Sequence, residues 1–283
     1  MKHSALLLSL LVATGFAAQG AEQAFDLETQ TGVIKGTLAL PSARGQVPVV
    51  LLIAGSGPTD RDGNAPAAAG RNDSLKMTAN ALAELGIASL RYDKRGVAAS
   101  SAAGPAEADL RFDNYVNDAA LWIAKLAKDP RFQGIAVLGH SEGSMIGMLA
   151  AQRSPAQAFI SVAGPAEQAP AVLRRQLEGQ LPPDLAQKNE EILNALESGN
   201  TVSDIPTPLL ALYRQSVQPY LISWFRYSPA DEVAKLRMPC LLVQGGTDIQ
   251  VGVTDAVDSG TPTILTVALW SAWLKRQRRG NLL

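Results

Sequence analysis

Ser141 is the residue whose type and surroundings most directly suggest chemistry. It stands between Gly139 and Gly143 in a Gly-x-Ser-x-Gly pattern, with the apolar run 135–138 before it and a helix-like segment, 144–153, after it. A serine on such a strand–turn–helix is held in a strained backbone conformation with its hydroxyl exposed, and the flanking glycines let strand and helix pass closely. The pattern predicts a nucleophile elbow; the alternative is a serine in a purely structural turn.

The composition is that of an ordinary globular protein. Its nearly neutral charge favours small, uncharged partners. The chain has 283 residues, of which 47% are hydrophobic and 18% charged, and its formal net charge is -1. This length is sufficient for one large α/β domain with an insertion. A nearly neutral chain lacks the basic surface that binds nucleic acid, so we expect no nucleic-acid partner. These values leave the oligomeric state open.

Residues 1–21 have the composition of a secretory signal peptide. Lys2 precedes an apolar core, 5–16, and small residues then place a cleavage site after Gly20. The alternative is a membrane anchor, but this core is too short to span a bilayer, so we expect no stable membrane span. The single cysteine, Cys240, cannot form an internal disulfide. We therefore expect a secreted or bacterial periplasmic protein.

Apolar runs alternate with amphipathic segments along most of the chain. The continuous run 47–53 is typical of a strand buried on both faces, and the runs 24–29 and 33–40 predict an antiparallel hairpin at the sheet edge. Further strands are expected at 87–92, 135–138, 158–162 and 240–244, and helices at 74–85, 112–126 and 144–153. The alternation predicts an α/β fold, with a mostly parallel central sheet and helices on both faces. The elbow then lies at the carboxyl edge of a central strand, where such sheets bind ligands.

The segment 164–235 interrupts this alternation. It contains eight prolines among helical pieces and no convincing strand, so we interpret it as a helical cap insertion over the site. Six of its apolar residues could line a pocket, or could simply pack the insertion onto the core: Leu209, Leu212, Tyr213, Trp224, Phe225 and Tyr227. The predicted organisation is a signal peptide at 1–21, a core at 22–163 and 236–258, the cap at 164–235, and an atypical tail at 259–283.

Four segments in this order resemble those of the α/β-hydrolase superfamily. They are Gly-Ser-Gly-Pro-Thr-Asp-Arg-Asp-Gly-Asn at 55–64, Arg-Tyr-Asp-Lys-Arg-Gly at 91–96, Gly-His-Ser-Glu-Gly at 139–143 and Gln-Gly-Gly-Thr-Asp-Ile-Gln-Val at 244–251. Within the superfamily, they are similar to the secreted esterase and serine-aminopeptidase-like group, S33-type and related to dienelactone hydrolases. The resemblance implies an α/β-hydrolase fold and a serine hydrolase of carboxylic esters, thioesters or small amides that needs no cofactor.

The resemblance also implies roles for four positions. Ser141 would attack a carbonyl carbon and form an acyl-enzyme. The backbone N–H groups of Glu142 and Ser56 would form the oxyanion hole, which meets the negative charge that develops on the carbonyl oxygen. Asp248 would be the triad acid, which orients a histidine and stabilises its cation. The alternative for Asp248 is a carboxylate that caps its own loop.

Two charged segments, 60–62 and 93–95, admit two interpretations. They could bind substrate, but ion pairs that brace the loops are the better interpretation of Asp-Arg-Asp and Asp-Lys-Arg. No set of residues has the spacing of metal ligands, so we expect no metal.

The catalytic pattern lacks its histidine. The family order Ser, Asp, His requires a histidine after Asp248, and the chain has only His3 and His140. His140 directly precedes Ser141, and neighbouring side chains on a strand or a sharp turn point apart. We therefore interpret His140 as structural rather than as the catalytic base.

The tail differs in composition from the rest of the chain. No acidic residue follows Asp258, whereas Trp270 and Trp273 precede four basic residues. Three explanations are open: a frameshift replaced the family's end, the histidine was lost and the protein binds without turnover, or a carboxylate serves as a weak base. The first and third predict an impaired serine hydrolase, and the second predicts a non-catalytic binding or relic member of the fold.

Overall fold

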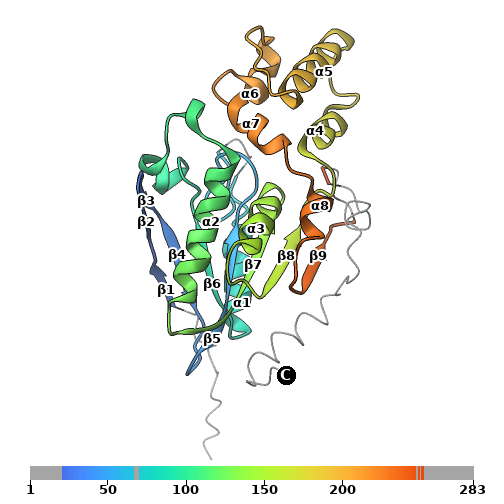
Figure 1. Cartoon of the computed structure of the whole chain (residues 1–283). Coiled ribbons are helices and arrows are strands. Elements are labelled where there is room, and N and C mark those ends of the chain that lie inside the picture. Colours follow the sequence, from blue (N-terminus) through green and yellow to red (C-terminus); the bar gives the residue numbers. More distant parts are fainter. Residues whose placement is uncertain (1–20, 67–69, 247, 249, 252–283) are drawn as a thin grey trace, which may run out of the picture.

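The described part of the chain is built around one seven-stranded sheet (Figure 1). The computed structural model describes residues 21–66, 70–246, 248 and 250–251. The signal peptide predicted for 1–21, apart from Ala21, and the tail predicted for 259–283 lie outside these residues.

The sheet is mostly parallel, as the alternation of elements predicts. Its order is β1-β4-β6-β5-β7-β8-β9; the pairs from β6 to β9 are parallel, and β4 pairs antiparallel with β1 and β6. The strands are β1 Ala21–Ala24, β2 Leu27–Thr29, β3 Gly32–Ile34, β4 Gly36–Leu40, β5 Val47–Ile53, β6 Ala88–Tyr92, β7 Phe132–His140, β8 Ala158–Val162 and β9 Cys240–Val243. The carboxyl ends of β5, β7, β8 and β9 therefore meet at one edge.

The hairpin predicted at the sheet edge is only partly correct. β2 and β3 pair antiparallel, but they form a separate two-stranded sheet, and β1 is the edge strand of the large sheet. The Asp26 carboxylate accepts hydrogen bonds from the Lys35 ammonium at 2.7 Å and from the Gly36 N–H at 3.3 Å. These contacts hold a bend between β3 and β4, so the run 33–40 is divided between two sheets.

Helices cover both faces of the large sheet. The α-helices are α1 Ser74–Glu84, α2 Phe112–Ala127, α3 Glu142–Gln152, α4 Ala169–Leu177, α5 Pro183–Glu197, α6 Leu210–Tyr213, α7 Gln218–Phe225 and α8 Pro229–Val233, and the 3₁₀ helices are η1 Ala98–Ala103, η2 Glu107–Asp109 and η3 Thr207–Leu209. Within the described residues, no helix combines the length and the apolar character needed to cross a membrane.

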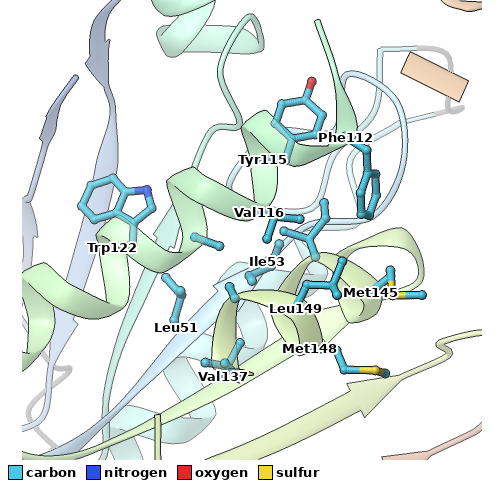
Figure 2. Close-up of a cluster of buried hydrophobic side chains, with 14 of the residues drawn as sticks. Leu51, Ile53, Phe112, Tyr115, Val116, Trp122, Val137, Met145, Met148 and Leu149 are labelled. Atoms are coloured by element: carbon cyan, nitrogen blue, oxygen red, sulfur yellow. The ribbon is translucent and has the colours of Figure 1, made fainter. Parts of the chain in front are cut away.

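The strand β5 explains why both faces are covered. All seven of its residues are buried, and successive side chains of a strand point to opposite faces. Leu51 and Ile53 pack in the cluster beneath α2 and α3, which Figure 2 shows in close-up. Val50 and Leu52 pack on the opposite face with Ala79 of α1. The continuous apolar run is therefore the signature of a central strand.

The chain between β8 and β9 forms helices α4 to α8, and Figure 1 shows α4 to α7 grouped at one end of the sheet, beyond α2 and α3. Five of the six apolar residues considered as pocket lining belong to the core cluster or pack against it: Leu209, Tyr213, Trp224, Phe225 and Tyr227. The Trp224 ring lies parallel to the Phe112 ring of α2, with centroids 5.6 Å apart. Leu212 is exposed. These contacts favour the packing alternative for these five, and the helical cap with its bounds, 164–235, stays a prediction.

We expect Ile123→Ala to lower the free energy of unfolding by about 2–5 kcal/mol, because it leaves a cavity in the core beneath α2. Ile123 is fully buried, whereas Leu121 on the same helix is 48% exposed. Leu121→Ala is the matched control and should change stability by less than about 0.5 kcal/mol. Urea denaturation of both variants measures the difference, and equal effects would contradict the assignment of the buried face.

The Cys240 thiol of β9 should react slowly in the native protein. Burial raises its pKa to about 11. The native state therefore holds the thiol proton more tightly than the unfolded chain does, and this contribution to stability is complete at neutral pH and is lost as the pH rises toward that value. Because this is the only cysteine, iodoacetamide alkylation reports on it alone. If the alkylation rate of the native protein rises with pH at the same midpoint as that of the urea-unfolded chain, β9 does not bury the thiol.

Candidate active site

Ser141 occupies a strained turn between β7 and α3. Its φ of 53° and ψ of -122° lie outside the regions that L residues favour. The Ser141 N–H donates to the Val162 carbonyl of β8 at 2.9 Å, and the Ser141 carbonyl accepts from the Ser144 N–H at 2.9 Å. The predicted strand–turn–helix elbow is therefore present, and α3 begins at Glu142, two residues before the predicted start.

The glycines on either side of Ser141 permit a backbone contact. A Cβ atom at Gly139 would lie 2.1 Å from the Gly143 carbonyl oxygen, and one at Gly143 would lie 2.5 Å from the carbonyl oxygens of Ala54 and Ile53. Real Cβ atoms essentially never come this close to other atoms. The first turn of α3 therefore rests directly on the carboxyl end of β5, which only glycine allows.

The loop after β5 lies beside Ser141. Gly55 is buried, and a Cβ atom at this position would lie 3.4 Å from the Ser141 Cβ, whereas Ser56 is exposed. The two backbone N–H groups predicted to form an oxyanion hole thus come from segments next to Ser141. One is at Ser56 in this loop, and the other is at Glu142 in the first turn of α3.

Asp248 lies in the loop after β9, at the same edge of the sheet as the elbow. Its carboxylate accepts hydrogen bonds from the backbone N–H groups of Gln250 at 2.9 Å and Val251 at 3.1 Å, and from the Gln244 side chain at 3.2 Å. Burial works to raise the pKa of Asp248, but these hydrogen bonds and the nearby His140 hold it below its usual value. The carboxylate is therefore ionised at neutral pH, and it also caps its own loop.

His140 is the last residue of β7. The residue is exposed, and its Nδ1 lies 3.1 Å from the Cβ position of Gly55. Partial desolvation lowers the pKa of His140, and the Asp248 carboxylate partly opposes this change. Within the described residues no hydrogen bond joins His140 to the Ser141 hydroxyl, and the structural interpretation of this histidine stays a prediction.

The charged segments brace the loops around the site, as their preferred interpretation predicts. Arg61 Nη2 lies 2.6 Å from Asp93 Oδ2, and Arg91 Nε lies 2.8 Å from Asp62 Oδ1. The first pair ties the loop after β5 to the loop after β6. The second pair ties the loop after β5 to β6 itself.

One buried network near Ser141 was missed by sequence reasoning. Lys94 forms an ion pair with Glu142 and donates to the Gly55 carbonyl, and the Tyr220 hydroxyl of α7 donates to Glu142. The available signal was a lysine two residues after a buried strand and a glutamate directly after the nucleophile. Sequence alone could not pair them, because they are 48 positions apart.

A small cavity of about 20 Å³ lies between α3, α8 and β9 rather than at Ser141. Ser144, Ser161 and Gly164 line it, and the hydroxyls of the two serines lie 2.7 Å apart. Among the described residues, no group of three or more His, Cys, Asp or Glu side chains is placed to hold a metal ion.

We expect Gly143→Ala to lower the free energy of unfolding by at least about 1–3 kcal/mol, the usual cost of overpacking a filled interior. Its added methyl meets two backbone oxygens at 2.5 Å, so α3 must move away from β5. Gly246→Ala is the matched control, because its methyl meets no described atom within 4 Å. Urea midpoints test both variants, and equal stability would show that α3 does not rest on β5.

Two comparisons by sequence bear on the family. Residues 70–218 match the family described as serine aminopeptidase, S33. The chain is 32% identical over 223 residues to Esterase EstD from Thermotoga maritima, and the match covers 78% of this chain and 52% of the relative. The chain therefore spans about half the length of that curated relative.

Solved structures share the fold at low sequence identity. Est1E from Butyrivibrio proteoclasticus has a TM-score of 0.60 at 17% identity, covering 90% of this chain and 97% of that chain. The α/β hydrolase GrgF from Penicillium has a TM-score of 0.57 at 20% identity, covering 92% of this chain and 98% of that chain. By fold and by the family match over 70–218, the chain belongs to the serine aminopeptidase S33 family, within the esterase-like α/β hydrolases.

Proposed function

We propose that the protein is a serine hydrolase of carboxylic esters that forms an acyl-enzyme on Ser141. The observation that carries the proposal is the strained backbone of Ser141 on the elbow between β7 and α3. Strain of this kind persists only where the surrounding structure maintains it, and it clusters at functional sites. The similarity to an esterase supports esters as substrates, and thioesters or small amides share the same acyl chemistry.

The proposed reaction has two halves. In the first, the Ser141 oxygen bonds to the carbonyl carbon, a base takes the hydroxyl proton, and the leaving alcohol departs with a proton. The backbone N–H groups of Ser56 and Glu142 stabilise the negative charge on the carbonyl oxygen. In the second, water attacks the acyl carbon, and the acid and Ser141 are released. Both halves require a proton acceptor close to the serine.

The sequence offers no clear candidate for this proton acceptor. Asp248 matches the acid that would orient a catalytic histidine, but no histidine follows it, and His140 has no hydrogen bond to the serine among the described residues. Losing a triad member typically leaves oxyanion stabilisation and binding but removes several orders of magnitude in rate. We therefore propose that acylation is slow and that turnover is nearly absent.

The second candidate is a non-catalytic binding member of the same family. The missing histidine favours it, since binding needs neither a base nor a leaving group. The two candidates differ at Ser141: a hydrolase that lacks its base still becomes acylated, whereas a pure binding protein does not.

We expect p-nitrophenyl acetate to give at most one equivalent of nitrophenolate per chain, with negligible steady turnover. Intact-mass spectrometry and peptide mapping should place the acetyl group on Ser141. Added imidazole should accelerate both release and deacylation, because it supplies the missing proton acceptor. Ser141→Ala is the control and should abolish the burst with and without imidazole.

Two results would contradict this proposal. No acylation of Ser141, even with imidazole, would favour the binding candidate. Steady turnover without imidazole that disappears in Ser141→Ala would show that the chain already contains a working base, and would overturn the impaired mechanism.

A further inference from the structure

Lys94 is a buried cation next to the proposed oxyanion hole. Its side chain is 1% exposed, and that of its partner Glu142 is 3% exposed. Lys94 Nζ lies 2.9 Å from Glu142 Oε2 and donates at 2.6 Å to the Gly55 carbonyl oxygen. The Tyr115 ring lies beneath the ammonium, 4.9 Å away at its centroid.

The two hydrogen-bond partners of Lys94 belong to the segments that carry the two proposed oxyanion donors. Gly55 immediately precedes Ser56, and Glu142 supplies the second backbone N–H itself. One ammonium therefore connects the loop after β5 with the first turn of α3. A buried charge tolerates little displacement from its partners, because each lost contact leaves a charge or a polar group without solvation.

The peptide plane relates the Lys94 contact to the direction of the Ser56 N–H. The carbonyl of Gly55 and the N–H of Ser56 belong to the same peptide group, and the described residues contain no cis peptide bond. In a trans peptide these two groups point in opposite directions. Because Lys94 holds the carbonyl on the buried side, the N–H is directed to the opposite side, away from the ammonium.

The network also reaches the cap insertion. The Tyr220 hydroxyl of α7 donates to Glu142 Oε1 at 2.6 Å, while Lys94 occupies Oε2. Burial and the Glu142 carboxylate raise the pKa of Tyr220 well above its usual value, so the hydroxyl remains a donor. Both oxygens of Glu142 are thus occupied, one by the core and one by the insertion.

We propose that Lys94 is a positioning residue that fixes the Gly55–Ser56 peptide and the Glu142 turn as one oxyanion hole, and that Tyr220 couples the cap to it. The inference rests on the proposed function of Ser141 as a nucleophile. Lys94 does not contact the substrate in this scheme; it acts through the two backbone N–H groups. Removal of its ammonium should therefore slow acylation without removing the nucleophile.

The test compares acylation by p-nitrophenyl acetate with acylation by its thiono analogue, in which sulfur replaces the carbonyl oxygen. Sulfur is a weaker hydrogen-bond acceptor, so a misaligned oxyanion hole slows the oxygen ester more than the thiono ester. We expect Lys94→Met to slow acylation by the oxygen ester about 10- to 100-fold, somewhat less than deletion of an oxyanion donor does. The ratio of the oxygen-ester rate to the thiono-ester rate should fall as well.

Two further variants keep the test valid if Lys94→Met folds poorly. Lys94→Met/Glu142→Gln leaves no unpaired buried charge, so its thermal stability should recover, but acylation should stay slow because the Gly55 carbonyl still lacks its donor. Tyr220→Phe removes one hydroxyl and should slow acylation about fivefold, the effect of one hydrogen bond.

Arg95→Met is the matched control. The Arg95 side chain forms the neighbouring buried ion pair with Asp118, at 2.5 Å, and also donates to the Thr31 hydroxyl. Among the described residues, no hydrogen bond joins the Arg95 or Asp118 side chain to Lys94, Glu142 or Gly55; the Arg95 carbonyl, which accepts from Tyr115, is unchanged by the substitution. The substitution should lower stability, yet leave the acylation rate per folded molecule and the rate ratio unchanged. It separates a local effect on the oxyanion hole from a general loss of packing.

The outcomes distinguish this inference from the proposed function. If the unmodified chain is not acylated on Ser141, the proposed function is wrong and the inference falls with it. If that chain is acylated, and the folded Lys94 variants keep its rate and rate ratio, only the inference is wrong. A slower rate with an unchanged ratio, matched by Arg95→Met, also overturns it.

Discussion

The backbone contact between the start of α3 and the end of β5 is the constraint on which the site depends. Gly143 packs against the carbonyl oxygens of Ile53 and Ala54, and the absence of a side chain at Gly139 leaves room for the Gly143 carbonyl. This contact forces Ser141 into its positive φ and brings the loop after β5 beside the serine. Because both β5 and α3 are packed into the core, relaxation of the turn would disturb the core on that face of the sheet.

Ion pairs with at least one buried partner hold the loops that surround this contact in one arrangement. Arg61 and Asp93 link the loops after β5 and β6, and Lys94 links the first of them to Glu142 of α3. Such pairs add little net stability, but removing one partner is strongly unfavourable, so they maintain a single arrangement of the loops. Tyr220 extends this arrangement to α7, and the stacking of Trp224 on Phe112 holds the same helix on α2.

Prediction from sequence succeeded where a local pattern reflects a local environment. The run 47–53 is apolar because alternate residues enter cores on opposite faces, and its position as a central strand followed from that. It was less accurate at the hairpin, because Asp26 holds a bend between β3 and β4 that alternation does not reveal. From sequence, the apolar residues of the segment 164–235 could not be assigned to packing or to a pocket, since both environments favour the same residue types.

The sequence by itself determined the order of strands and helices, the elbow around Ser141, and the absence of a histidine after Asp248. Each of these is a property of neighbouring residues or of residue counts. Only the tertiary structure decided which charges pair, where α7 rests, and which groups surround Glu142. These contacts join residues that the crossovers of a parallel sheet bring together from distant positions, and no local pattern encodes the partner of a buried charge.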